Sequence, residues 1–337
     1  MRKEWLARIL VVLLLATAIG IPAMAAKPRS NGIVIHARMA ETGGWTPENL
    51  TVAVGQPLRI RLTSDDVMHG FAIGKSDQPA VDVKPGEMTD LTLVFDRPGK
   101  YTFYCTRWCS VNHWRMRGTI EVTGPETTPD TVKPPLYTTL GLDIDSRRQA
   151  DSVPKQKPSG VRGAALAADP SLNLILKGYS GTDYYLAHSP LELWNALRSN
   201  RIFKNYTDQD IWDMTAWIWQ TNATHQARQV GAQLYATNCA ACHGEKGGGN
   251  GVFADQFAAG SENVHGDQTL GEQTLRPADF TDPSRMLTAS PPQLQGKILR
   301  GGMGTGMPYW GPIFTEEQTW ALVAYLWTFQ FQMEKIP

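Results

Sequence analysis

The first third of this 337-residue chain shows an alternation of apolar and polar positions. Within residues 30–123, segments 58–62 (LRIRL) and 91–95 (LTLVF) follow a period of two, and 101–104 (YTFY) is aromatic and β-prone. Such alternation is typical of strands that bury one face. Because turn residues such as Pro85-Gly86 separate these segments, the pattern predicts a sandwich of many short strands.

Beyond residue 160 the pattern becomes helical and contains a weak internal repeat. Residues 207–219 align with 315–327, and Thr, Trp, Ala and Trp recur at the same four offsets. Each copy opens on a threonine that can cap a helix, and Gln318 stands at the capping-box position of the second. A proline-led helix, at Pro190 and at Pro292, precedes each copy. We interpret the repeat as a duplication; the alternative is chance sharing of aromatic core positions by two amphipathic helices.

Between these regions, residues 124–160 contain six prolines and little apolar periodicity. This composition predicts an extended, partly ordered linker. The chain therefore divides into a β domain (27–123), the linker, a helical middle segment (161–225) and a C-terminal helical domain (226–337).

Residues 1–26 predict export from the cytoplasm. Three basic residues precede the apolar run 9–21, and Ala23-Met24-Ala25 offers small residues for signal peptidase. An uncleaved anchor is the alternative, because residues 9–26 approach the ~17–25 residues that span a bilayer. Gly20 and Pro22 favour cleavage. In either case we expect the rest of the chain outside the cytoplasm.

Composition adds two constraints. Lys plus Arg and Asp plus Glu number 32 each, so net charge favours neither a nucleic acid nor a membrane surface as partner, and we expect no nucleic-acid partner. The four cysteines form two pairs, each embedded in a ligand pattern, and none is left over for a structural disulfide.

The first cysteine pair lies in a cluster of metal-binding residues. Cys105, Cys109, His113 and Met116 form a C-x3-C-x3-H-x2-M pattern after a predicted strand, and His69 lies at the end of a strand upstream. Two thiolates, two imidazoles and a thioether make a soft ligand set, which favours copper.

Three alternatives account for less of this pattern. Zinc could use two cysteines and two histidines, but a thioether is a poor zinc ligand and one tight loop is unusual for zinc. A blue-copper site needs one cysteine. A disulfide between Cys105 and Cys109 fits an oxidising compartment but leaves the His and Met spacing unexplained. A binuclear copper centre uses every residue of the pattern.

Residues 45–122 resemble the copper A domain of haem-copper oxidase subunit II. The similarity is greatest to B-type oxidases, at residues 67–71 (VMHGF) and 116–120 (MRGTI). The resemblance implies a cupredoxin fold, which is a Greek-key sandwich. It also implies the copper ligands: bridging thiolates from Cys105 and Cys109, one imidazole for each copper from His69 and His113, the Met116 thioether, and the backbone carbonyl of Arg107.

Many members of that family carry Glu where this chain has Arg107. The side chain can change without loss of the site, because the carbonyl is the implied ligand. Together with Arg115 and Arg117, Arg107 makes the surroundings of the site more positive, which should raise its potential and alter partner docking.

The second cysteine pair belongs to a C-x-x-C-H haem-attachment sequence, formed by Cys239, Cys242 and His243. Two thiols one helical turn apart can add to the two vinyl groups of a haem, and the adjacent histidine then reaches the iron. Residues 226–330 resemble class I cytochromes c, which implies one covalent haem c.

The same resemblance makes Met307 the sixth iron ligand, since Met307-Pro308 matches the Met-Pro loop of the family; Met303 is the rival. A His/Met pair raises the haem potential, which suits an electron carrier. Where many relatives have proline after a Gly-x-Gly turn, this chain has Val252. A backbone carbonyl there could accept a hydrogen bond from the other ring nitrogen of His243.

The middle segment, residues 161–225, resembles the later half of a cytochrome c in its repeated helix. It contains no cysteine and no Met-Pro loop. We therefore interpret it as a haem-less remnant that serves packing.

Together the resemblances predict subunit II of a respiratory haem-copper oxidase with a fused cytochrome c, a redox subunit without a catalytic site of its own. It would accept electrons from a soluble cytochrome or another upstream donor. Electrons would pass from haem c to the binuclear copper and on to a subunit I-like membrane protein, at the periplasmic or extracytoplasmic face.

Two alternatives stay open, the electron-input subunit of a copper-A nitric oxide reductase and a free periplasmic carrier. Nitrous oxide reductase is excluded, because its catalytic cluster needs many histidines and only four of the seven here lie outside the two sites.

Overall fold

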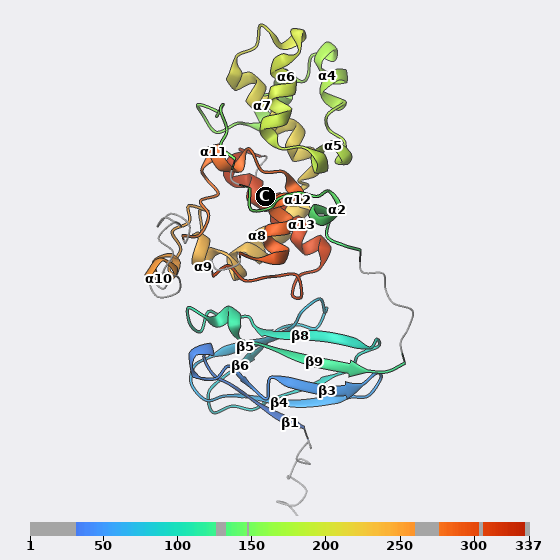
Figure 1. The fold of residues 1–337 in the computed structure, drawn as a ribbon, viewed down its shortest axis with the longest axis vertical. Coiled ribbons are helices and arrows are strands. Elements are labelled where there is room, and N and C mark those ends of the chain that lie inside the picture. The colour runs from blue at the N-terminus through green and yellow to red at the C-terminus, as the bar shows by residue number, and fades with distance from the viewer. Residues whose placement is uncertain (1–31, 126–132, 147, 260–275, 303–305, 334–337) are drawn as a thin grey trace, which may run out of the picture.

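The computed structural model describes residues 32–125, 133–146, 148–259, 276–302 and 306–333. The predicted export signal or anchor at 1–26 and the rival ligand Met303 lie outside these residues. Figure 1 shows a β domain, coloured blue to green, and a helical region, coloured green to red.

Residues 33–123 form two β sheets. One sheet has the strand order β2-β1-β4-β7 and the other has the order β3-β9-β8-β5-β6. The pairs β1–β4 and β3–β9 are parallel, and the other pairs are antiparallel. The predicted sandwich is confirmed. Its strands are β1 (Ile33–Ala37), β2 (Trp45–Thr46), β3 (Asn49–Ala53), β4 (Leu58–Ser64), β5 (His69–Ile73), β6 (Val81–Val83), β7 (Thr89–Leu93), β8 (Gly99–Cys105) and β9 (Arg117–Thr123).

The alternation in sequence separates a buried face from an exposed one. In β4, Leu58, Ile60 and Leu62 are buried in the core of the sandwich, whereas Arg59 is exposed. β5 departs from this pattern, because all five of its residues are buried. Both of its faces are covered, one by the core and the other by the loop that follows β8.

Beyond residue 160, the described residues are mainly helical, as predicted. Three short 3-10 helices, η1 (Ala40–Thr42), η2 (His113–Arg115) and η3 (Arg201–Phe203), occur among the residues that the structure describes. The described α-helices are α2 (Leu136–Thr139), α3 (Gly160–Leu166), α4 (Pro170–Lys177), α5 (Thr182–Ala187), α6 (Pro190–Ser199), α7 (Asp208–Asn222), α8 (His225–Asn238), α9 (Ala240–His243), α10 (Ala254–Ala259), α11 (Pro283–Met286), α12 (Pro291–Arg300) and α13 (Glu316–Gln330).

Two helix pairs of the same kind organise this region: α3 packs on α7, and α8 packs on α13. Each pair crosses at a glycine. An added Cβ at Gly231 would lie 2.0 Å from the carbonyl oxygen of Ala321, and one at Gly163 would lie 2.0 Å from that of Asp213. Asp213 and Ala321 are equivalent positions of the sequence repeat, so the likeness extends to the helix that packs on each copy. This equivalence favours duplication over chance.

The repeat threonines act as predicted. Thr207 and Thr315 are the N-caps of α7 and α13, and Gln318 completes the expected capping box of α13. Asp210 forms a second box in α7. The middle segment and the C-terminal helices share one hydrophobic core, in which Trp219 and Trp327 meet edge to face with ring centroids 5.8 Å apart. The boundary at residue 225 therefore separates repeats that pack together.

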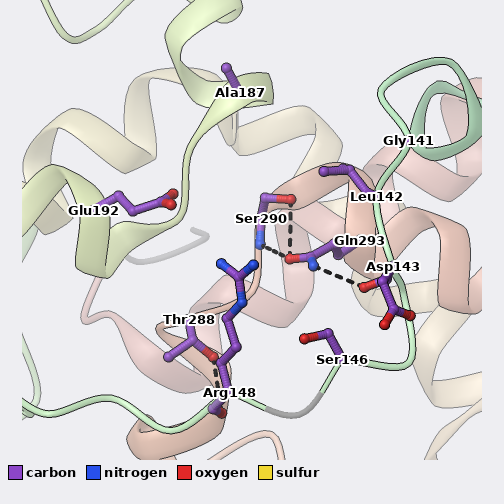
Figure 2. A pocket seen from close by; sticks show the side chains of 10 residues that line it. All are labelled: Gly141, Leu142, Asp143, Ser146, Arg148, Ala187, Glu192, Thr288, Ser290 and Gln293. Carbon is purple, nitrogen blue, oxygen red and sulfur yellow. Dashed lines mark hydrogen bonds between the residues drawn. The ribbon is translucent and has the colours of Figure 1, made fainter.

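The described part of the linker lies against the helical region. Asp145 pairs with Lys297 and, at 2.7 Å, with Arg300, and these hydrogen bonds hold the pKa of the Asp145 carboxyl well below its usual range. Gln293 donates to the Asp143 carbonyl at 3.2 Å beside a cavity of about 260 Å³ (Figure 2). The predicted linker is thus anchored over part of its length. None of the sequence-predicted metal ligands lines this cavity.

Candidate metal centres

Strand register brings the first group of ligands together. Cys105 is the last residue of β8 and lies opposite Phe71 of β5. His69, the first residue of β5 and two residues before Phe71, therefore lies on the same face of the sheet. The chain then continues through residues 106–116 and returns in β9. An added Cβ at Gly70 would lie 2.1 Å from Thr106 Oγ1, so the loop packs closely on β5.

Five of the six predicted copper ligands form one cluster. Cys105 Sγ lies 3.9 Å from Cys109 Sγ, 3.8 Å from His69 Nδ1 and 3.3 Å from the Arg107 carbonyl oxygen. Cys109 Sγ lies 3.3 Å from Met116 Sδ. The ligand atoms of His69, Cys105 and Cys109 all lie within 4.8 Å of one another. The arrangement concentrates soft donors at one point, as copper requires.

The sixth predicted ligand, His113, is only 2% exposed. Neither of its ring nitrogens has a hydrogen-bond partner among the described residues. Buried polar atoms without a partner are rare in folded proteins. His113 is among the groups that lower the pKa of Cys105, which places its ring beside the thiols. A metal ion at the cluster would satisfy the imidazole, so the residues present fit a copper centre.

The two thiols differ in acidity. Hydrogen bonding from Cys109 is the largest cause that lowers the pKa of the Cys105 thiol to about 3. The same contact raises the pKa of Cys109 far above its usual value. The shared hydrogen bond therefore favours loss of one proton before the other, and a bound cation favours loss of both.

Two residues that the sequence analysis did not single out position the cluster. Asp66 Oδ1 lies 2.7 Å from His69 Nε2, which leaves Nδ1 of the same ring directed at Cys105. Such a carboxylate–histidine pair fixes the orientation of a ligand ring. Trp45 Nε1 donates to the Met116 carbonyl at 3.1 Å. The sequence signal for Asp66 was its spacing of three residues from His69.

The haem-attachment sequence follows α8. Cys239 is the C-cap of that helix, and α9 carries Cys242 and His243. Burial raises the pKa of Cys239 to about 12 and that of Cys242 to about 11, so both remain thiols at neutral pH. Burial also lowers the pKa of His243, which favours the neutral imidazole that binds iron.

The carbonyl that meets His243 is not the one considered at Val252. The ring Nδ1 donates to the carbonyl oxygen of Ala278 at 3.1 Å, not to that of Val252. The reason is tertiary: the Phe280 N–H donates to the Gly247 carbonyl at 2.7 Å, and the Pro277 carbonyl approaches Gly249. Residues 277–280 therefore lie along the glycine turn and bring Ala278 to the ring.

An apolar cavity opens beside His243. Both predicted axial ligands, His243 and Met307, line it together with Cys239. The remaining walls are Tyr235, Phe280, Ile298, Trp310, Leu322 and Leu326. The donor set, one thiol, one imidazole and one thioether within apolar walls, is that of a haem attached through a thioether bond, and the space between these side chains is about 30 Å³. Cys242 is not among the residues that line the cavity.

In the part of the chain that the structure describes, no helix has the length and apolar character needed to cross a bilayer.

Two family models match the chain. The model "Cytochrome C oxidase subunit II, periplasmic domain" matches residues 37–123, and the model "Cytochrome c" matches residues 229–330. Cytochrome c oxidase subunit 2 of Thermus thermophilus is 37% identical over 79 residues, which are 23% of this chain and 58% of that protein. A second subunit 2 sequence from the same species is covered over 46% of its length.

Nitrous-oxide reductase of Ralstonia nicotianae is 28% identical over 100 residues, which are 27% of this chain and 15% of the reductase. Among solved structures, a chain of a heme-copper terminal oxidase dimer is 25% identical, with a TM-score of 0.24 over 36% of this chain and 99% of that one.

These matches fall on the two regions that carry the ligand clusters, and they imply copper for the first and haem for the second. The chain therefore joins a cupredoxin-like domain related to the periplasmic domain of cytochrome c oxidase subunit II to a cytochrome c domain.

Proposed function

We propose that this chain is the electron-transfer subunit of a respiratory haem-copper oxidase, equivalent to subunit II with a fused cytochrome c. When bound, one haem c and a pair of coppers supply two one-electron carriers. The observation that carries the proposal is the convergence of His69, Cys105 and Cys109 at one end of the sandwich, in a chain that also holds His243 and Met307 in one cavity.

The chain's own residues hold these carriers. Cys105 and Cys109 would supply the thiolates shared by the copper pair, and His69, His113, Met116 and the Arg107 carbonyl would supply its other ligands. Asp66 fixes the His69 ring, and the rigid sandwich behind the loop limits movement on electron transfer. Every position of the pair would be filled, which leaves no place for a gas to bind.

In the haem domain, Cys239 and Cys242 would attach the haem, and His243 and Met307 would bind the iron. The Ala278 carbonyl fixes the imidazole of His243. A His/Met pair also leaves no open position, so the domain would carry electrons without reacting with oxygen.

The middle segment serves packing in this proposal. Counting from the crossing glycines Gly163 and Gly231, His243 corresponds to Ile175, and Cys239 and Cys242 correspond to Ser171 and Leu174. The middle segment therefore lacks the two cysteines and the histidine that would hold a haem, while it keeps the helix pair and its core.

The proposal places the chain at the periplasmic or extracytoplasmic face of the membrane, exported or anchored through residues 1–26. Its partners would be a subunit I-like membrane protein, which receives electrons, and a soluble cytochrome or another donor that supplies them. Equal numbers of acidic and basic residues give no reason to expect a nucleic-acid partner.

Gas-consumption assays test this proposal. The purified chain should accept electrons from a chemical donor but should consume neither oxygen nor nitric oxide, because its centres have no open position. Oxygen consumption should appear when a membrane fraction with a haem-copper subunit is added.

Turnover by the chain alone would contradict the proposal. Nitric oxide consumption with membranes, in place of oxygen consumption, would favour the nitric oxide reductase. No turnover with any membrane fraction would favour a free carrier.

A further inference from the structure

The cytochrome domain docks on the β domain beside the copper cluster. The Lys75 N–H donates to the Ile313 carbonyl at 2.9 Å. Next to it, an added Cβ at Gly74 would lie 2.5 Å from the Pro312 carbonyl oxygen, so the two backbones meet closely. These contacts join the end of β5 to the segment between Met307 and α13, which lies between the two parts in Figure 1.

Arg117 makes a second docking contact. Its Nη1 donates to the Tyr309 carbonyl at 2.8 Å, and its guanidinium lies over the rings of Tyr309 and Trp310, 4.6 and 5.6 Å from their centroids. Desolvated cation–π contacts of this kind are among the stronger ones. Arg117 follows the predicted copper ligand Met116, and Tyr309 lies two residues after Met307. The docking face therefore joins the two ligand loops directly.

Beside these contacts, three rings form a continuous chain between the domains. The Trp108 ring lies 3.9 Å from that of His113, centroid to centroid, and 5.6 Å from that of Phe253. His113 is a predicted copper ligand. The Phe253 N–H donates at 2.9 Å to the carbonyl of Ala241, a residue inside the haem-attachment sequence. The three rings thus lead from the predicted copper centre to Phe253, and a backbone hydrogen bond joins Phe253 to the haem-attachment sequence.

We propose that Trp108 and Phe253 form the electronic contact through which haem and copper exchange electrons within this chain. The inference rests on the proposed function. With both centres loaded, one electron would pass from the haem, which would be oxidised, to the copper pair, which would be reduced, and the two rings would undergo no net change. Arg117 places a charged guanidinium, not a ring, between the domains, so we assign it, with Gly74, to holding the rings in place.

The test replaces either ring by leucine in the full, metal-loaded chain. After rapid reduction of the haem by a radiolysis pulse, the rate of electron transfer to copper is followed by absorption. Trp108→Leu and Phe253→Leu should each slow it by up to roughly a hundredfold, by analogy with the loss that a misplacement of about 1 Å causes between reacting groups. Trp114→Leu is the matched control, since this tryptophan of the same loop contacts Arg115 and should leave the rate unchanged.

A second readout does not depend on electron transfer. The protein is prepared without copper, with haem and with fluorotryptophan in place of tryptophan, and its fluorine NMR spectrum is recorded. The signal that is missing from Trp108→Leu is assigned to Trp108. Phe253→Leu should shift that signal, because it removes the neighbouring ring, and should leave the Trp114 signal in place.

Wild-type rates in both leucine variants, with both centres loaded, would overturn the proposal. If Trp108→Leu no longer binds copper, the rate measured in Phe253→Leu tests the proposal. The Phe253 side chain belongs to the haem domain and touches no predicted copper ligand. If the wild-type chain binds no copper or no haem, the proposed function itself is refuted. Spectra recorded before the pulse reveal whether both groups are bound.

Discussion

Cys109→Ser is expected to abolish the copper centre and to leave the haem unchanged. Cys109 Sγ lies 3.9 Å from Cys105 Sγ and 3.3 Å from Met116 Sδ. Its loss removes one of the two thiols at the centre of the ligand cluster. A serine hydroxyl is a hard, neutral donor that cannot replace a bridging thiolate. The mixed-valence electron paramagnetic resonance signal should disappear, and bound copper should fall below two per chain.

The haem spectrum of this variant should match that of the parent, because the ligands of the two centres belong to separate cores. Cys242→Ser is the reciprocal control: it should weaken covalent haem attachment and keep the copper signal. Joint loss of both spectra in Cys109→Ser would contradict two independently held centres.

Met307→Ala should remove the weak iron–sulfur absorption of the oxidised haem and lower the haem potential. Met307 lines the same apolar cavity as His243, and methionine ligation is the feature that raises the potential of such haems. An alanine methyl group has no donor atom, so water or another side chain would take the vacant iron position. Absorption of the oxidised protein and a redox titration measure both effects.

Met303→Ala is the matched control, since it removes a thioether from the same loop. It should leave the absorption and the potential as they are. If Met303→Ala gives the larger effect, Met303 is the axial ligand and the Met-Pro alignment is wrong.

Local patterns made most of the two sites predictable. The spacing C-x3-C-x3-H-x2-M predicted Cys105, Cys109, His113 and Met116 as one set because a single loop carries all four. His69 could be added because strand ends of one sheet meet at one edge. The alternation in β4 predicted the sandwich because a strand that buries one face has an apolar residue at every second position.

The features that could not be predicted from the sequence depend on contacts between segments that are far apart in the chain. Ala278, which accepts from His243, lies 35 residues beyond it and reaches the ring only because residues 277–280 pack on a glycine turn. The contact of Trp108 with Phe253 joins two domains, and no periodicity within either domain shows which of their surfaces meet. The anchoring of the linker by Asp145 is of the same kind.

The docked arrangement has a consequence for the order of electron flow. Trp108 and His113 are covered on one side by the cytochrome domain, through Phe253. An external donor would therefore deliver electrons to the haem more readily than to the copper from that side. The fusion also keeps the two domains at high effective concentration, so no second encounter is needed for each electron.

The central claim is that one chain holds a binuclear copper centre and a single covalent haem. Metal analysis and a haemochrome spectrum on one purified sample test it most directly. We expect two coppers and one haem c per chain, because the described residues offer one cluster with two thiols and one cavity with His243 and Met307. One copper, a zinc ion or two haems per chain would contradict the account.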